Sequence, residues 1–337
     1  MASKPLIIFD PFPRNEEMVF TQDVELELNK ISNLITYFGS RAPDKLIEEN
    51  LSEVEIIVGQ TSMPKERLDM ATKLKAIINV KANWEANIDY FEAQRRGIYV
   101  LSAAPAMAPA VAEACIGYAV SLARGTIHNY NKFINNEEKY GIAGNVNAYT
   151  LFNAKVGFIG FGNLAKSLLK LLQPFNCEVS VYDPWLSDSY LETQGVKPNE
   201  LNEVLSMNQF IFILAGVTSE NEGFINKDKL DLIQNDSSVI LVSRAEVLDF
   251  DYFVKLAKNN IFRAAADVFP EEPVPFDSPY RKATNILFTS HLAGGLYFSY
   301  KNIRDMMMDD IKQILKNYPP TRLQRAEPSQ VQLRRDR

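Results

Sequence analysis

One stretch of the chain, residues 155–183, limits the possible folds more than any other. It opens with a short apolar run, Val156–Ile159, which has the length of a buried strand. Residues 160–165, GFGNLA, follow at once and fit the G-x-G-x-x-G/A pattern of a tight turn that leads into a helix. A second strand-like run, residues 178–182, ends at Asp183. This order of strand, glycine turn, helix, strand and acid is typical of a dinucleotide-binding domain.

Each position of the turn has a physical role in that pattern. Gly160 permits the tight turn, Gly162 lets the backbone approach a pyrophosphate, and Ala165 is small enough for close packing of the helix on the strand. The amides of Asn163 and Leu164, at the start of the helix, would face the phosphates. A turn that binds nothing is the alternative for an isolated glycine pattern, and the complete order of elements favours the dinucleotide site.

Asp183 indicates which dinucleotide is bound. It lies about 20 residues beyond Gly162, where such a site hydrogen-bonds the adenosine ribose. A carboxylate at this position would repel the 2′-phosphate of NADP, and no Arg follows it directly. We therefore expect the cofactor to be NAD.

Length, charge and cysteine usage narrow the class of protein. A chain of 337 residues is expected to form about two domains. The net charge of −6 argues against nucleic acid and anionic membranes as main partners. Cys115 and Cys177 both lie in apolar patterns, which favours free thiols in a reducing cytoplasm. No secretory pattern is present and no apolar run reaches the ~18 residues of a membrane span, so we expect a cytoplasmic protein.

Strand-like and helix-like segments alternate along the whole chain. Strands are predicted at residues 6–9, 54–59, 75–80, 98–101, 156–159, 178–182, 208–214, 238–242, 264–267 and 285–289. Helices are predicted at residues 24–34, 65–72, 110–124, 166–172, 226–233, 249–259 and 299–317. The alternation predicts the α/β class, with two Rossmann-like domains, each a doubly wound parallel sheet.

Prolines and changes in polarity place the domain boundaries. Pro105 and Pro109 interrupt the first pattern, and Pro109 suits the first turn of the apolar helix at 110–124. Residues 126–151 are polar and rich in Asn, which predicts an exposed arm or a segment that clasps another subunit. The tail from about residue 320 is expected to be disordered. The expected domains are residues 1–105 with 297–337, which would bind the substrate, and residues 106–296, which would bind NAD.

Three ionisable residues are expected just past strand ends, where an open parallel sheet binds its ligands: Arg244, Glu272 and His291. The chain has only one other histidine, His128, which lies in the polar arm and is expected on the surface. His291 stands between a strand and the turn Ala293–Gly295, which favours a role in proton transfer. From its position alone, a purely structural histidine is an equal alternative.

Motifs in the second half of the chain resemble those of one enzyme family. Residues 267–273, DVFPEEP, followed by residues 289–295, TSHLAGG, resemble the D-isomer-specific 2-hydroxyacid dehydrogenases. Residues 239–248, with Arg244, resemble the family's arginine motif, and residues 216–220 resemble its loop over the nicotinamide side. The motifs keep the family's order along the chain.

The resemblance implies a hydride-transfer enzyme with its active site in a cleft between the two domains. A 2-oxo acid would bind there with Arg244 on its carboxylate, since a guanidinium forks onto planar carboxylates. NADH would supply the hydride, and protonated His291 would donate a proton to the oxygen, giving a D-2-hydroxy acid. Glu272 would orient the imidazole and favour its charged form. The resemblance also implies a homodimer.

The predicted ligand contacts combine the glycine turn with the family motifs. For the cofactor they are Gly160, Gly162, Asn163, Leu164, Asp183, Gly216, Val242, Ser243, Asp267 and Gly294. For the substrate they are Val80, Lys81, Ala82 and Arg244. No metal site is expected.

The sequence also departs from the family pattern. The family's substrate-carboxylate loop is rich in glycine, whereas here residues 79–85 read NVKANWE. Ala245 stands where a glycine usually follows the arginine, and Leu241 where asparagine is frequent. Lys81 in this loop predicts an anionic group on the substrate, with a solvent-facing lysine as the alternative.

Two other functions stay open at this stage. The same fold occurs in an NAD(H)-sensing corepressor that resembles these enzymes and can keep residues matching Arg244, Glu272 and His291. A phosphite- or phosphonate-type dehydrogenase on the same scaffold is the second alternative. Glu272 argues against a formate-type enzyme, which resembles this family but has glutamine at the matching place.

Overall fold

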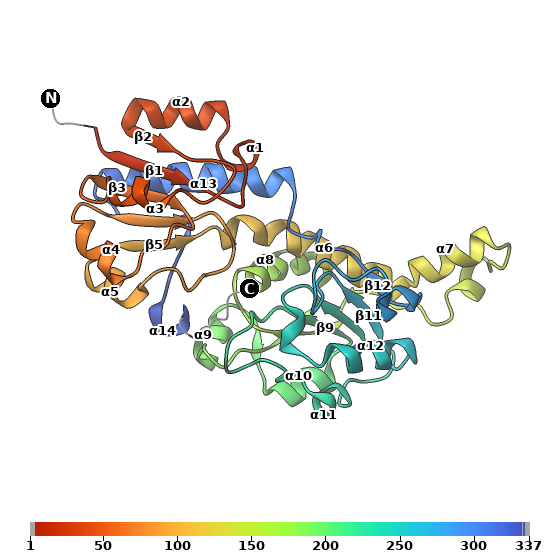
Figure 1. Cartoon of the computed structure of the whole chain (residues 1–337). Helices are drawn as coiled ribbons and strands as arrows, with labels where there is room; N and C mark the ends of the chain where they lie inside the picture. The colour runs from red at the N-terminus through yellow and green to blue at the C-terminus, as the bar shows by residue number, and fades with distance from the viewer. Residues whose placement is uncertain (1–3, 332, 334–337) are drawn as a thin grey trace. The chain divides into compact units, whose positions relative to one another are not determined.

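The computed structural model describes residues 4–331 and 333, and the chain divides into two compact units (Figure 1). Unit 1 combines the chain up to Ala108 with the chain from Gly295 onward, and unit 2 spans Pro109–Gly294. These limits fall within a few residues of the predicted boundaries. Each unit contains its own parallel sheet with helices on both faces, so the predicted α/β class with two Rossmann-like domains is confirmed.

Unit 1 is built on a six-stranded sheet in the order β13-β5-β4-β3-β1-β2. The strands are β1 (Leu6–Asp10), β2 (Asn33–Thr36), β3 (Val54–Gly59), β4 (Ala76–Asn79), β5 (Tyr99–Ser102) and β13 (Gln324–Arg325). All pairs are parallel except β13 with β5. Helices α2 (Gln22–Ile31) and α13 (Tyr297–Leu315) cover one face, and α3 (Asp44–Glu48), α4 (Lys65–Met70) and α5 (Tyr90–Arg95) cover the other. The short helices α1 (Glu16–Val19) and α14 (Pro328–Val331) complete the unit.

The segment after α2 differs from the prediction of one helix over residues 24–34. The helix ends at Ser32, whose backbone is extended with φ −144° and ψ 164°. The amide and the hydroxyl of Ser32 both donate to the carbonyl of Leu28, at 2.9 Å and 2.8 Å, and so cap the last turn. Leu34 lies in β2 and pairs with β1. The apolar spacing of the segment fits a helix, but pairing with the sheet overrides it.

The tail that was expected to be disordered is ordered through residue 331, so that prediction is wrong. The carboxylate of Asp310, fully buried in α13, accepts hydrogen bonds from the amides of Thr321 and Leu323, each at 2.8 Å. The turn that these bonds fix brings β13 onto β5, where the amide of Ala326 donates to the carbonyl of Val100 at 2.8 Å. Polar composition could not reveal this, because one distant carboxylate orders the turn. Residues 332 and 334–337 of the predicted tail lie outside the described residues.

Unit 2 is built on a seven-stranded parallel sheet in the order β12-β11-β10-β9-β6-β7-β8. Its strands are β6 (Lys155–Ile159), β7 (Glu178–Tyr182), β8 (Lys197–Pro198), β9 (Phe210–Ile213), β10 (Ser238–Leu241), β11 (Arg263–Ala266) and β12 (Leu287–Phe288). Its main helices are α8 (Asn163–Leu172), α9 (Asp188–Thr193), α10 (Leu201–Met207), α11 (Lys227–Leu230) and α12 (Phe250–Lys258). Apart from the exposed Lys155 and the buried Ser238 at their starts, strands β6, β9 and β10 are apolar and buried on both faces, as central parallel strands require. Cys115 and Cys177 are free thiols, and burial raises the pKa of each.

Helix α6 (Ala104–Arg124) begins earlier than the predicted helix at 110–124 and contains both prolines. Pro105 lies in the first turn, where no amide is needed, and Pro109 forgoes only its bond to the carbonyl of residue 105. By length and composition α6 could cross a membrane, which corrects the expectation that no segment is long enough. Half of its most apolar stretch is buried inside the protein, and buried core helices can have the same length and composition.

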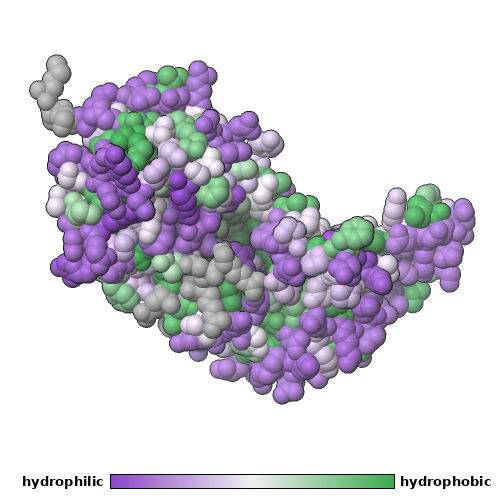
Figure 2. Space-filling model, in the orientation of Figure 1, coloured by the Kyte–Doolittle hydropathy of each residue, from purple (hydrophilic) through white to green (hydrophobic). Residues whose placement is uncertain are grey.

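The predicted arm begins with α7 (Thr126–Ile134) and includes a short 3-10 turn at Gly141–Gly144. None of the nine residues of α7 is buried, and His128 is exposed on it. Large apolar side chains lie exposed along the arm: Tyr130, Phe133, Ile134, Tyr140, Ile142 and Val146. Green hydrophobic residues are visible at the end of the arm in Figure 2. An exposed apolar surface of this kind is typical of one that a protein partner covers.

Candidate active site

The glycine turn after β6 has the geometry that a dinucleotide requires. Gly160 has a φ of +93°, and an added Cβ would lie 2.8 Å from the backbone of Ala215, so only glycine fits there. Gly162 caps the N-terminus of α8, and an added Cβ on it would meet no protein atom within 4 Å. The space in front of Gly162 is therefore open to a ligand, beside the amides of Asn163 and Leu164 at the start of α8.

Asp183 follows β7 directly and lies against this turn. Its Oδ2 accepts a hydrogen bond from the amide of Phe161 at 2.8 Å, and its Oδ1 accepts one from the amide of Trp185 at 3.0 Å. Two backbone donors thus hold a half-exposed carboxylate next to the first glycine of the pattern. The negative charge lies where it can meet a ribose and repel a phosphate.

The other predicted cofactor positions differ in how much surface they offer. Gly216, in the loop after β9, is exposed, and its carbonyl accepts a bond from Asn221 Nδ2 at 2.8 Å. Val242 and Gly294 are buried. The hydroxyl of Ser243 donates to the carbonyl of Ile213 at 3.0 Å, so that side chain joins neighbouring strand ends.

Asp267, which follows β11, organises the loop that carries His291. Its buried carboxylate accepts bonds from the Thr289 hydroxyl at 2.6 Å, the Leu292 amide at 2.9 Å and the Ala293 amide at 3.0 Å. The Asp267 carbonyl accepts from the His291 amide at 2.8 Å. A buried carboxylate with several donors is expected to be rigid, because each donor would be costly to leave without an acceptor.

Tyr118, on α6, extends this network. Its hydroxyl lies 2.8 Å from the Thr289 hydroxyl and 3.5 Å from Asp267 Oδ1. Since Thr289 donates to Asp267, the short bond is one that Tyr118 donates. Burial raises the pKa of Tyr118, which keeps the hydroxyl protonated as a donor.

Glu272 and His291 form a close ionisable pair in the strand-end loops of unit 2. Glu272 Oε2 lies 2.7 Å from His291 Nδ1, and Glu272 Oε1 accepts from the Phe269 amide at 2.9 Å. The carboxylate is therefore held by the backbone on one oxygen and presented to the ring on the other. His291 has a φ of +54°, an uncommon conformation outside glycine, and its side chain is 48% exposed. This bond belongs to Glu272 rather than to the adjacent Glu271.

Arg244 follows β10, the neighbour of β11 in the sheet. Its Nη1 donates to the carbonyl of Ser243 at 2.7 Å. Ala245, at the position where the family usually has glycine, is buried and starts a short 3-10 helix. The loops after three adjacent strands, β10, β11 and β12, thus carry Arg244, Glu272 and His291 at the edge where the strands end, which we call the carboxyl edge of unit 2.

The predicted substrate loop of unit 1 lies after β4, at the carboxyl edge of that unit's sheet. Val80 is completely buried in this structure, and its contact with the substrate stays a prediction. Lys81 and Ala82 are half-buried. The Lys81 amide donates to Asn79 Oδ1 at 2.7 Å, and Lys81 Nζ forms an ion pair with Glu85.

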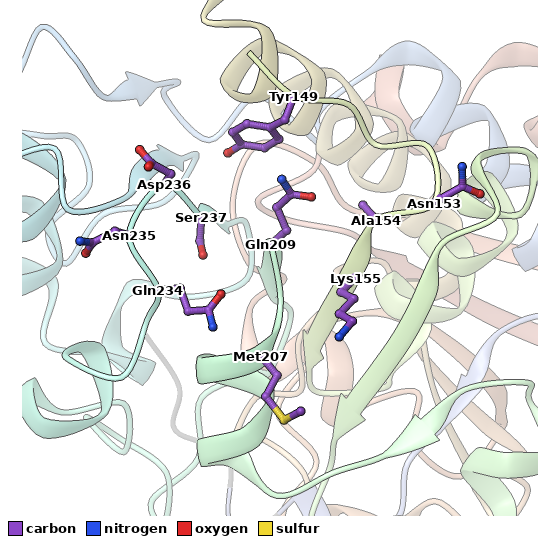
Figure 3. Close-up of a pocket in the computed structure, with 10 residues that line it drawn as sticks. All are labelled: Tyr149, Asn153, Ala154, Lys155, Met207, Gln209, Gln234, Asn235, Asp236 and Ser237. Carbon is purple, nitrogen blue, oxygen red and sulfur yellow. The ribbon is translucent and has the colours of Figure 1, made fainter. Parts of the chain in front are cut away.

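A cavity of about 510 Å³ lies at the opposite end of unit 2's strands (Figure 3). Lys155, Gln209 and Ser237, at the starts of β6, β9 and β10, contribute to its lining. It holds no pair comparable to Glu272 and His291, and it does not reach the carboxyl edge. Within residues 4–331 and 333, no group of three or more His, Cys, Asp or Glu side chains could hold a metal ion.

Comparison with known proteins decides the family. The model of the family described as D-isomer specific 2-hydroxyacid dehydrogenase, NAD binding domain, matches residues 116–293, more than half of the chain. The chain belongs to the D-isomer specific 2-hydroxyacid dehydrogenases. Unit 2 is its NAD-binding domain, and the class of reaction is NAD-dependent oxidoreduction between 2-oxo and 2-hydroxy acids, as the sequence motifs predict.

Relatives of this dehydrogenase cover most of its length. The glyoxylate reductase of Pyrococcus horikoshii is 24% identical over 292 residues, 84% of this chain and 86% of that enzyme. The D-3-phosphoglycerate dehydrogenase of Methanocaldococcus jannaschii is 25% identical over 80% of this chain and 51% of that enzyme. Among solved structures, a phosphoglycerate oxidoreductase from Rhizobium etli has a TM-score of 0.87 and 33% identity, covering 96% of this chain and 99% of that one.

Several residues that shape these edges carry no signal in the sequence of this dehydrogenase. Tyr118 lies in an apolar helix, and only its contact with Thr289 reveals a polar role. Asn79 and Glu85 stand in a loop without a recognisable motif. Arg41, whose Nη2 donates to Glu85 Oε2 at 3.2 Å, lies far from both in the sequence. Their grouping depends on the strand order of the sheet.

Proposed function

We propose that the chain interconverts a 2-oxo acid and a D-2-hydroxy acid, with His291 as acid and base, Glu272 as its orienting partner and Arg244 on the substrate carboxylate. The observation that carries this proposal is the 2.7 Å contact between Glu272 Oε2 and His291 Nδ1. That contact occupies one ring nitrogen and leaves Nε2 for proton transfer. In reduction, Nε2 gives its proton to the substrate oxygen, and in oxidation neutral Nε2 accepts it.

The carboxyl edge of unit 2 fits the cofactor on its own geometry. The open space at Gly162 and the amides that begin α8 would hold the pyrophosphate, and Asp183 would accept bonds from the ribose hydroxyls. NADH, when bound, supplies the hydride. Asp183 should favour NADH strongly over NADPH by repelling the 2′-phosphate. Saturation binding of both cofactors tests this, with Asp183→Ser narrowing the gap and equal affinities in the unmodified protein contradicting it.

A panel of 2-oxo acids tests the proposed reaction. NADH consumption with at least one member, lost in Arg244→Lys and in His291→Ala, is the expected result. Arg244→Lys should fail because an ammonium cannot make the paired bonds of a guanidinium with a carboxylate. NADH binding without turnover of any 2-oxo acid would instead favour the corepressor-like function. NAD reduction with phosphite as the reductant would favour the phosphite-type enzyme.

We also propose that the substrate carries a second anionic group, which Lys81 binds at the carboxyl edge of unit 1. A lysine is a compact point charge suited to a carboxylate or a phosphate. The names of relatives that act on phosphoglycerate support this class of substrate. Lys81→Met should weaken kcat/KM for a dianionic 2-oxo acid selectively, and equal losses for a monoanion would contradict it.

A cytoplasmic homodimer is the proposed working form. The exposed apolar residues of α7 and the arm support a second copy of the chain as the partner. Sedimentation should give about twice the chain mass of 38.1 kDa. A mass of one chain at micromolar concentration would contradict the dimer.

A further inference from the structure

Three charged side chains meet at the carboxyl edge of unit 1. Glu85 Oε1 forms an ion pair with Lys81 Nζ, and Glu85 Oε2 accepts from Arg41 Nη2 at 3.2 Å. The side chains of Lys81, Glu85 and Arg41 are 29%, 20% and 37% exposed, so all three are partly shielded from water. One carboxylate therefore lies between two cations, and these three side chains together carry a net charge of +1. The buried carboxylate of Asp10 also interacts electrostatically with Arg41.

The backbone around this cluster is fixed. Asn79 accepts from the Lys81 amide and donates to the Asn83 carbonyl, both at 2.7 Å, which ties the loop after β4 to the strand end. The Tyr90 hydroxyl donates to the Glu85 carbonyl at 2.6 Å. These bonds hold the backbone that carries Lys81 and Glu85, whereas the long charged side chains of the cluster keep rotamer freedom.

The cluster has unused capacity to bind an anion. Arg41 Nη1 is buried and has no hydrogen-bond partner among the described residues. A guanidinium can fork onto two oxygens of one carboxylate or phosphate, but Glu85 divides its two oxygens between two cations. An anion with more acceptor oxygens, such as a phosphate, would satisfy more of these donors.

We propose that Glu85 determines substrate specificity by occupying the position of an anionic group between Lys81 and Arg41. This inference rests on the proposed function, in which the loop after β4 meets the substrate. A 2-oxo acid with a distal carboxylate or phosphate binds by displacing Glu85 from one or both cations. The carboxylate of Glu85 thus competes with the substrate's distal anion and sets how strongly the site prefers dianions over monoanions.

Glu85→Gln tests the proposal, because it keeps the size of the side chain and removes its charge. Two 2-oxo acids with the same five-carbon chain serve as substrates: 2-oxoglutarate, a dianion, and 2-oxopentanoate, a monoanion. The ratio of their kcat/KM values should rise about tenfold in favour of the dianion, since one nearby negative charge is lost. Lys81→Met should move the same ratio in the opposite direction. An unchanged ratio in both variants would overturn the proposal.

Glu55→Gln is the matched control. Glu55 pairs with Lys75 at 3.1 Å, with side chains 22% and 33% exposed, at the opposite end of the strands of the same sheet. Glu55→Gln removes an equivalent ion pair from unit 1 and should leave the ratio of the two kcat/KM values unchanged. A similar rise in this control would mean that the effect comes from net charge rather than from the cluster, and would also overturn the proposal.

A binding measurement separates this proposal from the proposed reaction. Trp84 is adjacent to Glu85, and Trp185→Phe leaves it as the sole tryptophan of the chain. Glutarate and pentanoate, which cannot be reduced, are titrated against its fluorescence with and without Glu85→Gln. Tighter glutarate binding in the variant supports the proposal even if no 2-oxo acid is turned over. Turnover of 2-oxo acids without any change in glutarate affinity sustains the reaction and overturns the role of Glu85.

Discussion

The carboxyl edges of the two sheets hold their polar groups in different ways. In unit 2, Asp267 and Glu272 are each bonded by backbone amides, and both act on the short loop that carries His291. In unit 1, Lys81, Glu85 and Arg41 bond one another through long side chains. Backbone donors fix a group to within a narrow range, whereas long charged side chains retain rotamer freedom. We infer that the edge of unit 2 serves the invariant chemical step and that the edge of unit 1 adapts to the substrate.

The largest expected effect comes from His291→Ala. Loss of the proton donor should reduce kcat by roughly 10²–10⁴-fold, while NADH binding is retained. Steady-state kinetics and cofactor titration check both quantities. His128→Ala is the control, because His128 is the only other histidine and is exposed on α7. An equal loss of kcat in both variants would contradict a catalytic role for the carboxyl edge of unit 2.

Asp267→Asn tests the rigidity of that edge. An amide offers one oxygen in place of two and turns its NH₂ toward donors, so either the partly buried amide of Leu292 or the buried amide of Ala293 loses its acceptor. The free energy of unfolding should fall by about 3 kcal/mol. Lys81→Met, at the carboxyl edge of unit 1, should cost less than about 1 kcal/mol, since partly exposed ion pairs contribute little. Chemical denaturation measures the free energy of unfolding of both variants. Similar losses in the two variants would contradict a difference in rigidity between the two edges.

Glu272→Gln tests whether Glu272 contributes to catalysis by orienting His291 or only supports the loop. Reduction uses the protonated ring of His291 and oxidation the neutral ring. A neutral amide at position 272 is a weaker acceptor than the carboxylate that bonds Nδ1, so the ring is oriented less firmly and both rates should fall about tenfold. Initial rates in each direction measure this. Unchanged rates would show that Glu272 only supports the loop.

The smallest expected effect comes from Tyr118→Phe. Removing the hydroxyl takes one donor from Thr289 and the long 3.5 Å contact from Asp267, and it leaves the shorter bonds from Thr289, Leu292 and Ala293 to Asp267 in place. We expect a two- to fivefold loss of kcat, about 1 kcal/mol or less. Tyr149→Phe is the control, since it removes a 2.6 Å bond to Ser238 at the other end of the strands. If Tyr149→Phe lowers kcat as much, the loss in Tyr118→Phe comes from general destabilisation and not from the hydrogen bonds around Asp267.

The sequence predicts the two edges to different degrees. The glycine turn, Asp183 and the residues after β10, β11 and β12 can be located in advance, because the motifs are local and the strands end where the apolar runs end. The partners of Glu85 cannot, since Arg41 reaches it from the loop after β2, and two strands, β3 and β1, separate β2 from β4 in the sheet order. The burial of Val80 could not be predicted either, because a position in a loop does not reveal burial. The order of the tail was not predicted because it depends on hydrogen bonds to Asp310, which lies 11 residues before Thr321.

The division of unit 1 into two stretches of chain has a consequence for biosynthesis. Strand β5 leaves the ribosome before the whole of unit 2, whereas α13 and β13, which cover and extend its sheet, leave after it. At typical rates of elongation, unit 2 takes roughly ten to forty seconds to emerge. Throughout that interval the nascent sheet exposes the apolar face that Ile303, Met307 and Ile311 later bury. Unit 2 is continuous in sequence and can fold as it appears. A stalled or truncated chain would therefore contain a folded cofactor domain together with an incomplete unit 1 whose exposed apolar face is prone to aggregation.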